Sequence, residues 1–324
     1  MGFARFAGRR ALGAALLVAG AVVLNFLLVH LAPGDPALML AGEAGASSEA
    51  TLREIRAEFG LDRPLAVQLG VYLARLGRAD LGFSYFYRRP VLGLIGERIP
   101  ATLLLVIPAL ALAAVAGVGF GVLAARRPRS LLSHALSVAW LLGYCMPVFW
   151  TSVMLLLLFA VKLPWFPAHG MATAGADTAG WASVLDVAHH LVLPVTALGL
   201  VYVALYSRLT RASMLGTLGS DYVRTARAKG LAEGRVLLVH ALRNALLPVV
   251  TVAGLQLGQV LAGAILIETV FAWPGLGRLA FESILRRDYP LLLGTLLCSS
   301  AAVVAANFLT DLTYAWLDPR IRRG

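Results

Sequence analysis

The chain has 324 residues, of which 59% are hydrophobic and only 14% are charged, and its mean hydropathy is +0.80. Soluble domains are about 25% charged, so this composition leaves too little polar surface to cover a water-soluble fold. The net charge of +11 would suit a nucleic-acid-binding protein, but the positions of the basic residues argue against that class.

Long charge-free windows define the fold class. Six windows of at least 21 residues lack Asp, Glu, Lys and Arg, apart from Asp311 in the last of them. About 20 apolar residues cross a bilayer as a helix. We therefore predict an all-α membrane protein with six transmembrane helices at about 11–34, 99–125, 131–161, 187–207, 244–267 and 289–316.

The basic residues predict how the chain is oriented in the membrane. Four segments that would lie on one side hold 16 Lys and Arg, and the two short segments on the other side hold four. Basic residues are concentrated on the cytoplasmic side of membrane proteins. We therefore predict that the side with 16 Lys and Arg is cytoplasmic and that both termini lie on it. Its four segments are 1–10, 126–130, 208–243 and 317–324.

The segment between the first two predicted spans is expected to be structured. Thr51 and Glu54 fit a capping box that opens one helix. A second amphipathic helix is predicted by the spacing of Leu65, Leu69, Tyr72 and Leu76. The segment is either a lid packed on the spans or a docking surface for an extracytoplasmic partner. We divide the chain into an anchor helix with this outer segment, 1–95, and a permease core, 96–318.

Sequence motifs of enzymes and metal sites are not found. The chain has no GxxxxGK[ST] phosphate loop, no HExxH and no CxxC, and we predict neither a catalytic site, a metal site nor a bound cofactor. Charges within the spans, which mark ion-coupled transport, are nearly missing. The polar residues in the spans either form interhelical hydrogen bonds, the interpretation we favour, or line a path; they are Asn25, Gln256, Gln259 and Asn307.

The cytoplasmic segment 208–243 carries the most informative pattern. A short helix is predicted from Asp221 to Gly230, with Ser220 or Asp221 as its cap and Gly230 as its stop. Val223, Ala226 and Gly230 recur at helical spacing, with Tyr222 beside them, and such a face suits insertion into a groove of a soluble partner. A solvated basic loop that touches anionic lipid is the alternative. The periodicity and the glycine stop favour docking.

Eight stretches in order resemble the membrane permease subunits of ABC-type importers, in the dipeptide, oligopeptide and nickel branch, over essentially the whole chain. One difference lies at the cytoplasmic motif, where this chain has Arg224, Thr225 and Ala226 in place of the family's Glu-Ala-Ala. The matching stretches are LVHLAPGDPA, EFGLDRPLAVQ, ERIPATLLL, DYVRTARAKGL, HALRNALLPVVT, ETVFAWPGLGRL, RDYPLLLGTLL and TDLTYAWLDPRIR.

The resemblance implies a type I ABC importer fold in the bacterial inner membrane, with half of a translocation path in this chain. It further implies a second related permease, two ATP-binding subunits that hold ATP and Mg²⁺, and an extracytoplasmic substrate-binding protein. The expected cargo is a peptide, with nickel or another small solute as the alternative. A self-sufficient channel or carrier and a membrane-embedded enzyme are the rival functions.

The resemblance also implies roles for named residues. Contact with the ATPases is expected at Asp221, Tyr222, Arg224, Thr225, Ala226 and Gly230. In the stretch 268–277 a stiff turn with an interfacial aromatic residue is expected, and it is a candidate outer gate; its residues are Trp273, Pro274 and Gly275. The candidates for path-lining polar residues are Gln256, Gln259 and Asn307.

Overall fold

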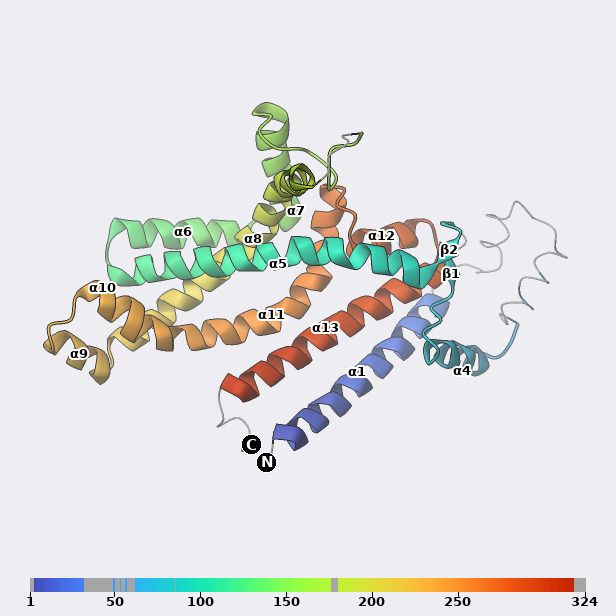
Figure 1. Cartoon of the computed structure of the whole chain (residues 1–324), viewed down its shortest axis with the longest axis horizontal. Coiled ribbons are helices and arrows are strands. Elements are labelled where there is room, and N and C mark those ends of the chain that lie inside the picture. Colours follow the sequence, from blue (N-terminus) through green and yellow to red (C-terminus); the bar gives the residue numbers. More distant parts are fainter. Residues whose placement is uncertain are drawn as a thin grey trace. The chain divides into compact units, whose positions relative to one another are not determined.

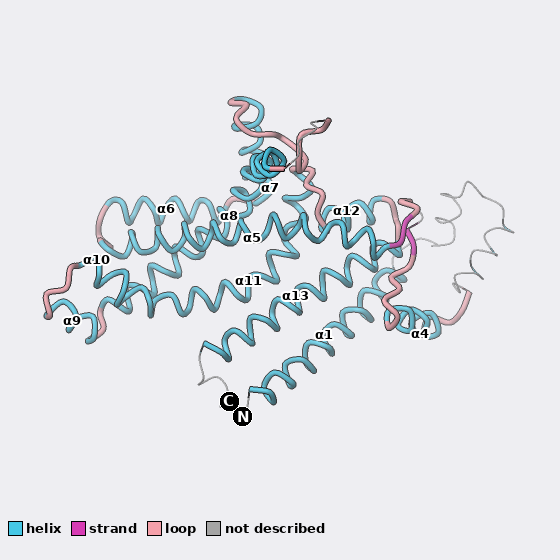
Figure 2. The backbone as a smooth tube through the Cα atoms, in the orientation of Figure 1, coloured by secondary structure: helices cyan, strands magenta, loops and turns pink. Residues whose placement is uncertain are grey.

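The structure is a computed structural model that describes residues 3–31, 49, 53, 56, 62–84, 86–175 and 180–317. Helices form nearly all of the described chain (Figure 1), and a single two-stranded ribbon is the other regular element among the described residues (Figure 2). The chain divides into two compact units, residues 1–101 with 274–324 and residues 102–273. Each unit is described by itself.

The first unit is built on two long helices that run side by side, α1 (Phe3–Leu31) and α13 (Tyr289–Leu317) (Figure 1). Arg10 of α1 forms an ion pair with Asp311 of α13, with 3.0 Å between the charged atoms. The predicted amphipathic helix is confirmed as α4 (Leu65–Leu76). Its Tyr72 stacks on Phe26 of α1. The capping box at Thr51 and Glu54 lies outside the described residues.

Other described elements of the first unit pack around the start of α5 (Val91–Arg126), a helix that continues into the second unit. A short antiparallel ribbon precedes it, in which β1 (Phe83–Ser84) pairs with β2 (Arg89–Pro90). The helix α12 (Leu276–Leu285) packs on α13. Buried apolar side chains hold these elements together, because burial of such surface is the main favourable term in packing; they include Val91, Ile95, Leu279 and Leu291.

Among its described residues, the second unit contains the rest of α5 and eight further helical elements. The helices α6 (Leu131–Cys145) and α7 (Val148–Leu156) lead into a π-helical turn η1 (Leu157–Lys162). The long helix α8 (Trp181–Leu218) follows and packs on α6, α7 and α11. The chain then forms α9 (Asp221–Ala228), α10 (Glu233–Arg235), a second π-helical turn η2 (Val236–Ala241) and α11 (Leu242–Val270).

Five stretches of helix among the described residues are long and apolar enough to cross a membrane, and each overlaps one of the six predicted windows, although the stretch at 233–254 begins 11 residues before its window, 244–267. They are Ala7–Leu28, Val91–Arg126, Trp181–Leu218, Glu233–Gly254 and Tyr289–Leu312. The helices α5 and α8 extend well beyond their predicted windows, 99–125 and 187–207. Their amphipathic or charged ends lie outside any charge-free window, so the windows underestimate them.

The third predicted window, 131–161, is not one straight helix. It is broken into α6 and α7, which meet at an angle of 102°. The break falls at Met146 and Pro147, and Met146 has an extended backbone with ψ of 130°. Proline disfavours a helical conformation in the residue before it and has no N–H to donate. The count of spans reaches six only if this bent pair is one span.

Close contact between α5 and α8 depends on two glycines of α5. A Cβ atom on Gly117 would lie 2.7 Å from Tyr206 Cβ, and one on Gly121 would lie 2.5 Å from Thr210 Cβ. The two glycines are four residues apart and therefore share one face of the helix. This is the small-xxx-small pattern that lets membrane helices approach closely.

Candidate coupling segment and outer turn

The coupling segment begins where α8 ends. Gly219 caps α8, and Ser220 has the extended backbone of an N-cap residue. The predicted side-chain cap is not formed, and the Ser220 hydroxyl donates to the Thr217 carbonyl oxygen at 2.6 Å. Asp221 lies in the first turn of α9, where its negative charge interacts favourably with the positive end of the helix dipole. It also pairs with Arg224 at 3.0 Å.

The predicted face of α9 points into the protein, which differs from its expected orientation toward a partner. Val223 is completely buried and Ala226 is 6% exposed. Both pack in a cluster with Met214 at the end of α8 and with η2 and the start of α11, through Val236 and other apolar residues. The small side chains therefore place α9 closely against α8 and α11 of its own chain.

The opposite face of α9 is exposed, and it carries Asp221, Tyr222, Arg224 and Thr225. Thr225 donates its hydroxyl proton to the Asp221 carbonyl oxygen at 2.9 Å, within the helix. The Tyr222 hydroxyl accepts a hydrogen bond of 2.7 Å from Asn244 of α11. That bond links the exposed face directly to α11, and nothing in the helical spacing indicated it.

The turn after α9 is held by one glycine and one ion pair. Gly230 has φ of +73°, the left-handed region that glycine adopts without strain. Arg227 binds the Glu233 carboxylate with two hydrogen bonds, of 2.7 and 3.2 Å. The hydrogen bonds between them raise the pKa of Arg227 above its ordinary value and lower the pKa of Glu233 below its own, so both side chains are charged at neutral pH.

The outer turn after α11 is tighter and more buried than predicted. The Trp273 N–H donates to the Glu268 carbonyl oxygen at 2.8 Å and so closes the turn. Trp273 is completely buried, which corrects its interpretation as an interfacial aromatic residue: its ring is a core side chain. Within the turn, Ala272 adopts a positive φ of +50°. Gly275 takes the N-cap position of α12.

A buried carboxylate that is not among the predicted site residues lies at the base of this turn. Glu268 has no exposed surface, and Thr102 of α5 donates a hydrogen bond of 2.6 Å to its Oε1. Acidic residues are rare in apolar helices of membrane proteins, and they are usually paired with another polar group. That signal was present in the sequence, within the matched stretch ETVFAWPGLGRL.

The predicted path-lining residues are divided between the two units, with Gln256 and Gln259 on α11 and Asn307 on α13. Gln256 of α11 is half-buried, and its Oε1 accepts no hydrogen bond from the described residues. The side chain of Gln259 lies outside what the structure describes. Asn307 is half-buried on α13, in the other unit. Within the described part of the chain, no three His, Cys, Asp or Glu residues are grouped as metal ligands.

In the first unit, polar contacts fasten the β1–β2 ribbon to α12 and α13. Ser84 donates its hydroxyl proton to Asp288, which also accepts the Leu291 N–H at 3.2 Å. Tyr87 donates to Glu282 of α12 at 2.8 Å. Burial raises the pKa of the Asp288 carboxyl above its ordinary value, although the hydrogen bonds that it accepts act in the opposite direction.

Comparison with known proteins places the whole chain in one family. Residues 117–323 match the binding-protein-dependent transport system inner membrane component, and residues 3–106 match the N-terminal part of such membrane components. The chain is 43% identical over 320 residues to the dipeptide transport system permease protein DppB of Escherichia coli (strain K12), covering 94% of each chain. It is 41% identical over 319 residues to the di/tripeptide transport system permease protein DppB of Pseudomonas aeruginosa, again covering 94% of each.

Family membership also identifies the general partners and excludes catalysis by this chain. Transporters of this kind work with ATPase subunits and a substrate-binding protein, and ATP hydrolysis belongs to the separate ATPases. The apolar helices agree with a multi-pass protein of the bacterial inner membrane. The chain belongs to the binding-protein-dependent transport system inner membrane component family, as a permease subunit of an ABC importer.

Proposed function

We propose that the cargo of this permease is a peptide of two or a few residues. The supporting observation is the extent of identity to two permeases named for dipeptide and di/tripeptide transport, which covers 94% of each chain. Nickel and other small solutes are the alternative cargoes for the same machinery. A self-sufficient channel is the second function to be tested, and family membership argues against it.

We infer that the working assembly contains this chain, a second related permease, two ATP-binding subunits that hold ATP and Mg²⁺, and an extracytoplasmic binding protein. In this assembly, both termini and the segment 208–243 face the cytoplasm. The excess of basic residues on that side supports the orientation. The division into an anchor region, 1–95, and a permease core, 96–318, stays a prediction.

We propose that α9 transmits ATPase motion to the path. Its exposed residues, Asp221, Tyr222, Arg224 and Thr225, provide the contact with the ATPase. Ala226 acts from the opposite face, where it keeps α9 seated on α8 and α11. A displacement of α9 therefore moves two spans together, since closely packed helices shift as units rather than deform.

The outer turn and the polar side chains complete the proposed path. Trp273, Pro274 and Gly275 form the outer gate in this proposal. The backbone N–H of Trp273 closes the turn with a hydrogen bond, which supports a gate that moves as a rigid body. Gln256, Gln259 and Asn307 are proposed as polar contacts for cargo. The unpartnered oxygen of Gln256 supports its inclusion.

Uptake by the reconstituted assembly tests the cargo. The assembly would be placed in vesicles with ATP on the ATPase side and the binding protein on the other side, and uptake of a labelled dipeptide would be measured with nickel ions or unlabelled dipeptide as competitor. We expect uptake that needs ATP and is suppressed by the dipeptide alone. Uptake by this chain without ATPases would establish the channel instead.

Gly230 tests the coupling role. Gly230→Val forces a β-branched residue into the left-handed region, while the space around the Cβ position is open. We expect ATP hydrolysis to continue while dipeptide uptake falls at least about tenfold, since a strain of about 1–3 kcal/mol displaces the turn. Gly234→Val, at a glycine with ordinary φ and equally open space, is the matched control and should keep uptake. Unchanged uptake by Gly230→Val would contradict the role of the turn.

A further inference from the structure

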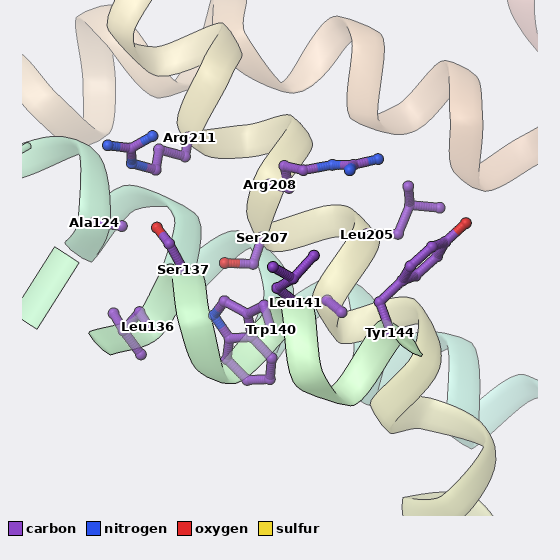
Figure 3. A pocket seen from close by; sticks show the side chains of 11 residues that line it. Ala124, Leu136, Ser137, Trp140, Leu141, Tyr144, Leu205, Ser207, Arg208 and Arg211 are labelled. Carbon is purple, nitrogen blue, oxygen red and sulfur yellow. The ribbon is translucent and has the colours of Figure 1, made fainter. Parts of the chain in front are cut away.

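A cavity opens in the second unit between α6 and α8, beside the end of α5. Its volume is about 260 Å³. Figure 3 shows the side chains that line it, and the polar or aromatic ones are Ser137, Trp140, Tyr144, Ser207, Arg208 and Arg211. No acidic residue is among its lining residues. The proposed path and coupling roles use none of these side chains.

Two side chains that line the cavity carry buried hydrogen-bond donors without acceptors. The indole Nε1 of Trp140 and the Nε of Arg211 are buried, and neither has a hydrogen-bond partner among the described residues. Buried polar groups in native proteins are nearly always hydrogen-bonded. Both groups can only donate, so the missing partner is an acceptor. The cavity is therefore built for a ligand that carries acceptor oxygens.

The arrangement of the side chains favours an anion on one side of the cavity. In Figure 3 the guanidinium of Arg211 and the hydroxyls of Ser137 and Ser207 lie toward the same side, whereas Arg208 is turned toward Tyr144. Its guanidinium carbon lies 5.8 Å from the centre of the Tyr144 ring. Arg211 is thus the cation on the side of the two hydroxyls, and a guanidinium fork matches phosphate oxygens well.

The position of the cavity along the spans indicates the source of that phosphate. Arg208 and Arg211 directly follow the charge-free window 187–207, on the side where basic residues are concentrated. At that end of the unit the α5–α6 turn and α9 also lie (Figure 1). Beside the cavity α6 exposes apolar surface at Leu141 and Tyr144, which are 60% and 55% exposed. Basic pockets between spans on the cytoplasmic side are typical sites for anionic lipid headgroups.

We propose that this cavity binds the headgroup of an anionic phospholipid of the inner leaflet. Its phosphate accepts from Arg211 and the Trp140 indole, and its acyl chains lie along the exposed apolar face of α6. A cavity below the roughly 300–1,000 Å³ of small-molecule sites holds a headgroup rather than a whole lipid. The proposal rests on the cytoplasmic assignment of this side. The lipid would lie on α8, the helix that leads into α9.

Quenching of Trp140 fluorescence provides the test. The full chain, assembled with its partner subunits, would be reconstituted in phosphatidylcholine vesicles containing increasing fractions of phosphatidylglycerol with brominated acyl chains. The difference between the unmodified protein and W140F isolates Trp140 from the other five tryptophans. We expect strong quenching at low fractions of brominated phosphatidylglycerol, and recovery when unbrominated phosphatidylglycerol is added. Brominated phosphatidylcholine that quenches equally well would overturn the proposal.

Charge variants and small anions separate a lipid site from other sources. R211Q should raise the fraction of brominated phosphatidylglycerol needed for half-quenching about tenfold, because a charge-assisted hydrogen bond is lost. R127Q removes the same charge in the α5–α6 turn, outside the cavity, and should have no such effect. Equal shifts for both variants would overturn the site in favour of general surface charge. Relief of quenching by millimolar inorganic phosphate, or by a dipeptide, would identify a free-anion or cargo site and overturn the lipid assignment.

Discussion

The contact between α5 and α8 allows a sharp prediction, because three glycines of one helix differ only in what surrounds them. Substituting alanine at Gly121 places a Cβ 2.5 Å from Thr210 Cβ and 2.7 Å from the Ser207 carbonyl oxygen. The same change at Gly117 places it 2.7 Å from Tyr206 Cβ and 3.0 Å from the Val203 carbonyl oxygen. At Gly119 the added atom meets nothing within 4 Å.

The expected cost follows from which atoms must move. At Gly121 and Gly117 the obstacles are backbone oxygens and Cβ atoms, which cannot rotate away, so the helices must separate. Overpacking of this kind costs about 1–3 kcal/mol, and we expect Gly121→Ala to fall near the upper end and Gly117→Ala below it. Gly119→Ala gains up to about 1 kcal/mol from helix propensity. The predicted order of stability is Gly119→Ala first and Gly121→Ala last.

Thermal inactivation in mild detergent provides the assay. Each variant would be heated in steps, and the monodisperse fraction would be measured by size-exclusion chromatography. A loss of about 2–3 kcal/mol lowers the midpoint by about 2–4 °C per kcal/mol in chains of 150–250 residues and by less in a longer chain, so we expect a fall of a few degrees. Gly119→Ala is the control, and its midpoint should be no lower than that of the unmodified chain. Equal midpoints for the Gly121 and Gly119 variants would refute the close approach of α5 to α8.

Three further predictions concern buried and exposed charges. Glu268→Ala leaves the buried Thr102 hydroxyl without its acceptor and opens a cavity, so we expect a loss of about 2–4 kcal/mol in stability, measured by thermal inactivation. Glu268→Gln keeps an acceptor and should lose less than half of that stability. The pKa of Asp288 is raised in the folded state, so near and above the ordinary value of 3.8 the folded protein binds more protons than the unfolded protein. The contribution of Asp288 to stability therefore falls as the pH rises through its folded pKa. Asp288→Asn should flatten this part of a stability profile measured between pH 4 and 7, and an unchanged slope would contradict the assignment. Arg227→Gln breaks a largely exposed pair with Glu233 and should change stability by at most about 1 kcal/mol, so a larger loss of the folded fraction on heating would show that the turn depends on the pair.

Charge-free windows were sufficient to predict five spans because the bilayer imposes length and apolarity on each helix. They could not predict the bend of the third window, since hydropathy does not register backbone geometry; Pro147 was the only local signal. Helical spacing predicted α9 and its glycine stop. It could not tell which face of α9 points inward, because that depends on the apolar cluster formed with Met214 and Val236, which lie outside the helix.

Buried polar contacts were the least predictable part of the candidate site. Glu268 and Thr102 are separated by 166 residues, and Ser84 and Asp288 by 204, so no local pattern links either pair. Gly117 and Gly121, in contrast, form a recognisable small-xxx-small pattern. This spacing is a sequence signal for the close approach of α5 to another helix.

The π-helical turn Val236–Ala241 sets the rotational phase of the helix that follows. The backbone is helical without interruption from Glu233 to Val270, and a π-turn accommodates one residue more than an α-helical turn. Because one residue corresponds to about 100° of rotation, deleting a residue here would leave a continuous helix but turn Glu268 about 100° away from Thr102. Relatives that differ by one residue in this stretch would therefore present a different face of α11 to the interior, even where their hydropathy profiles coincide.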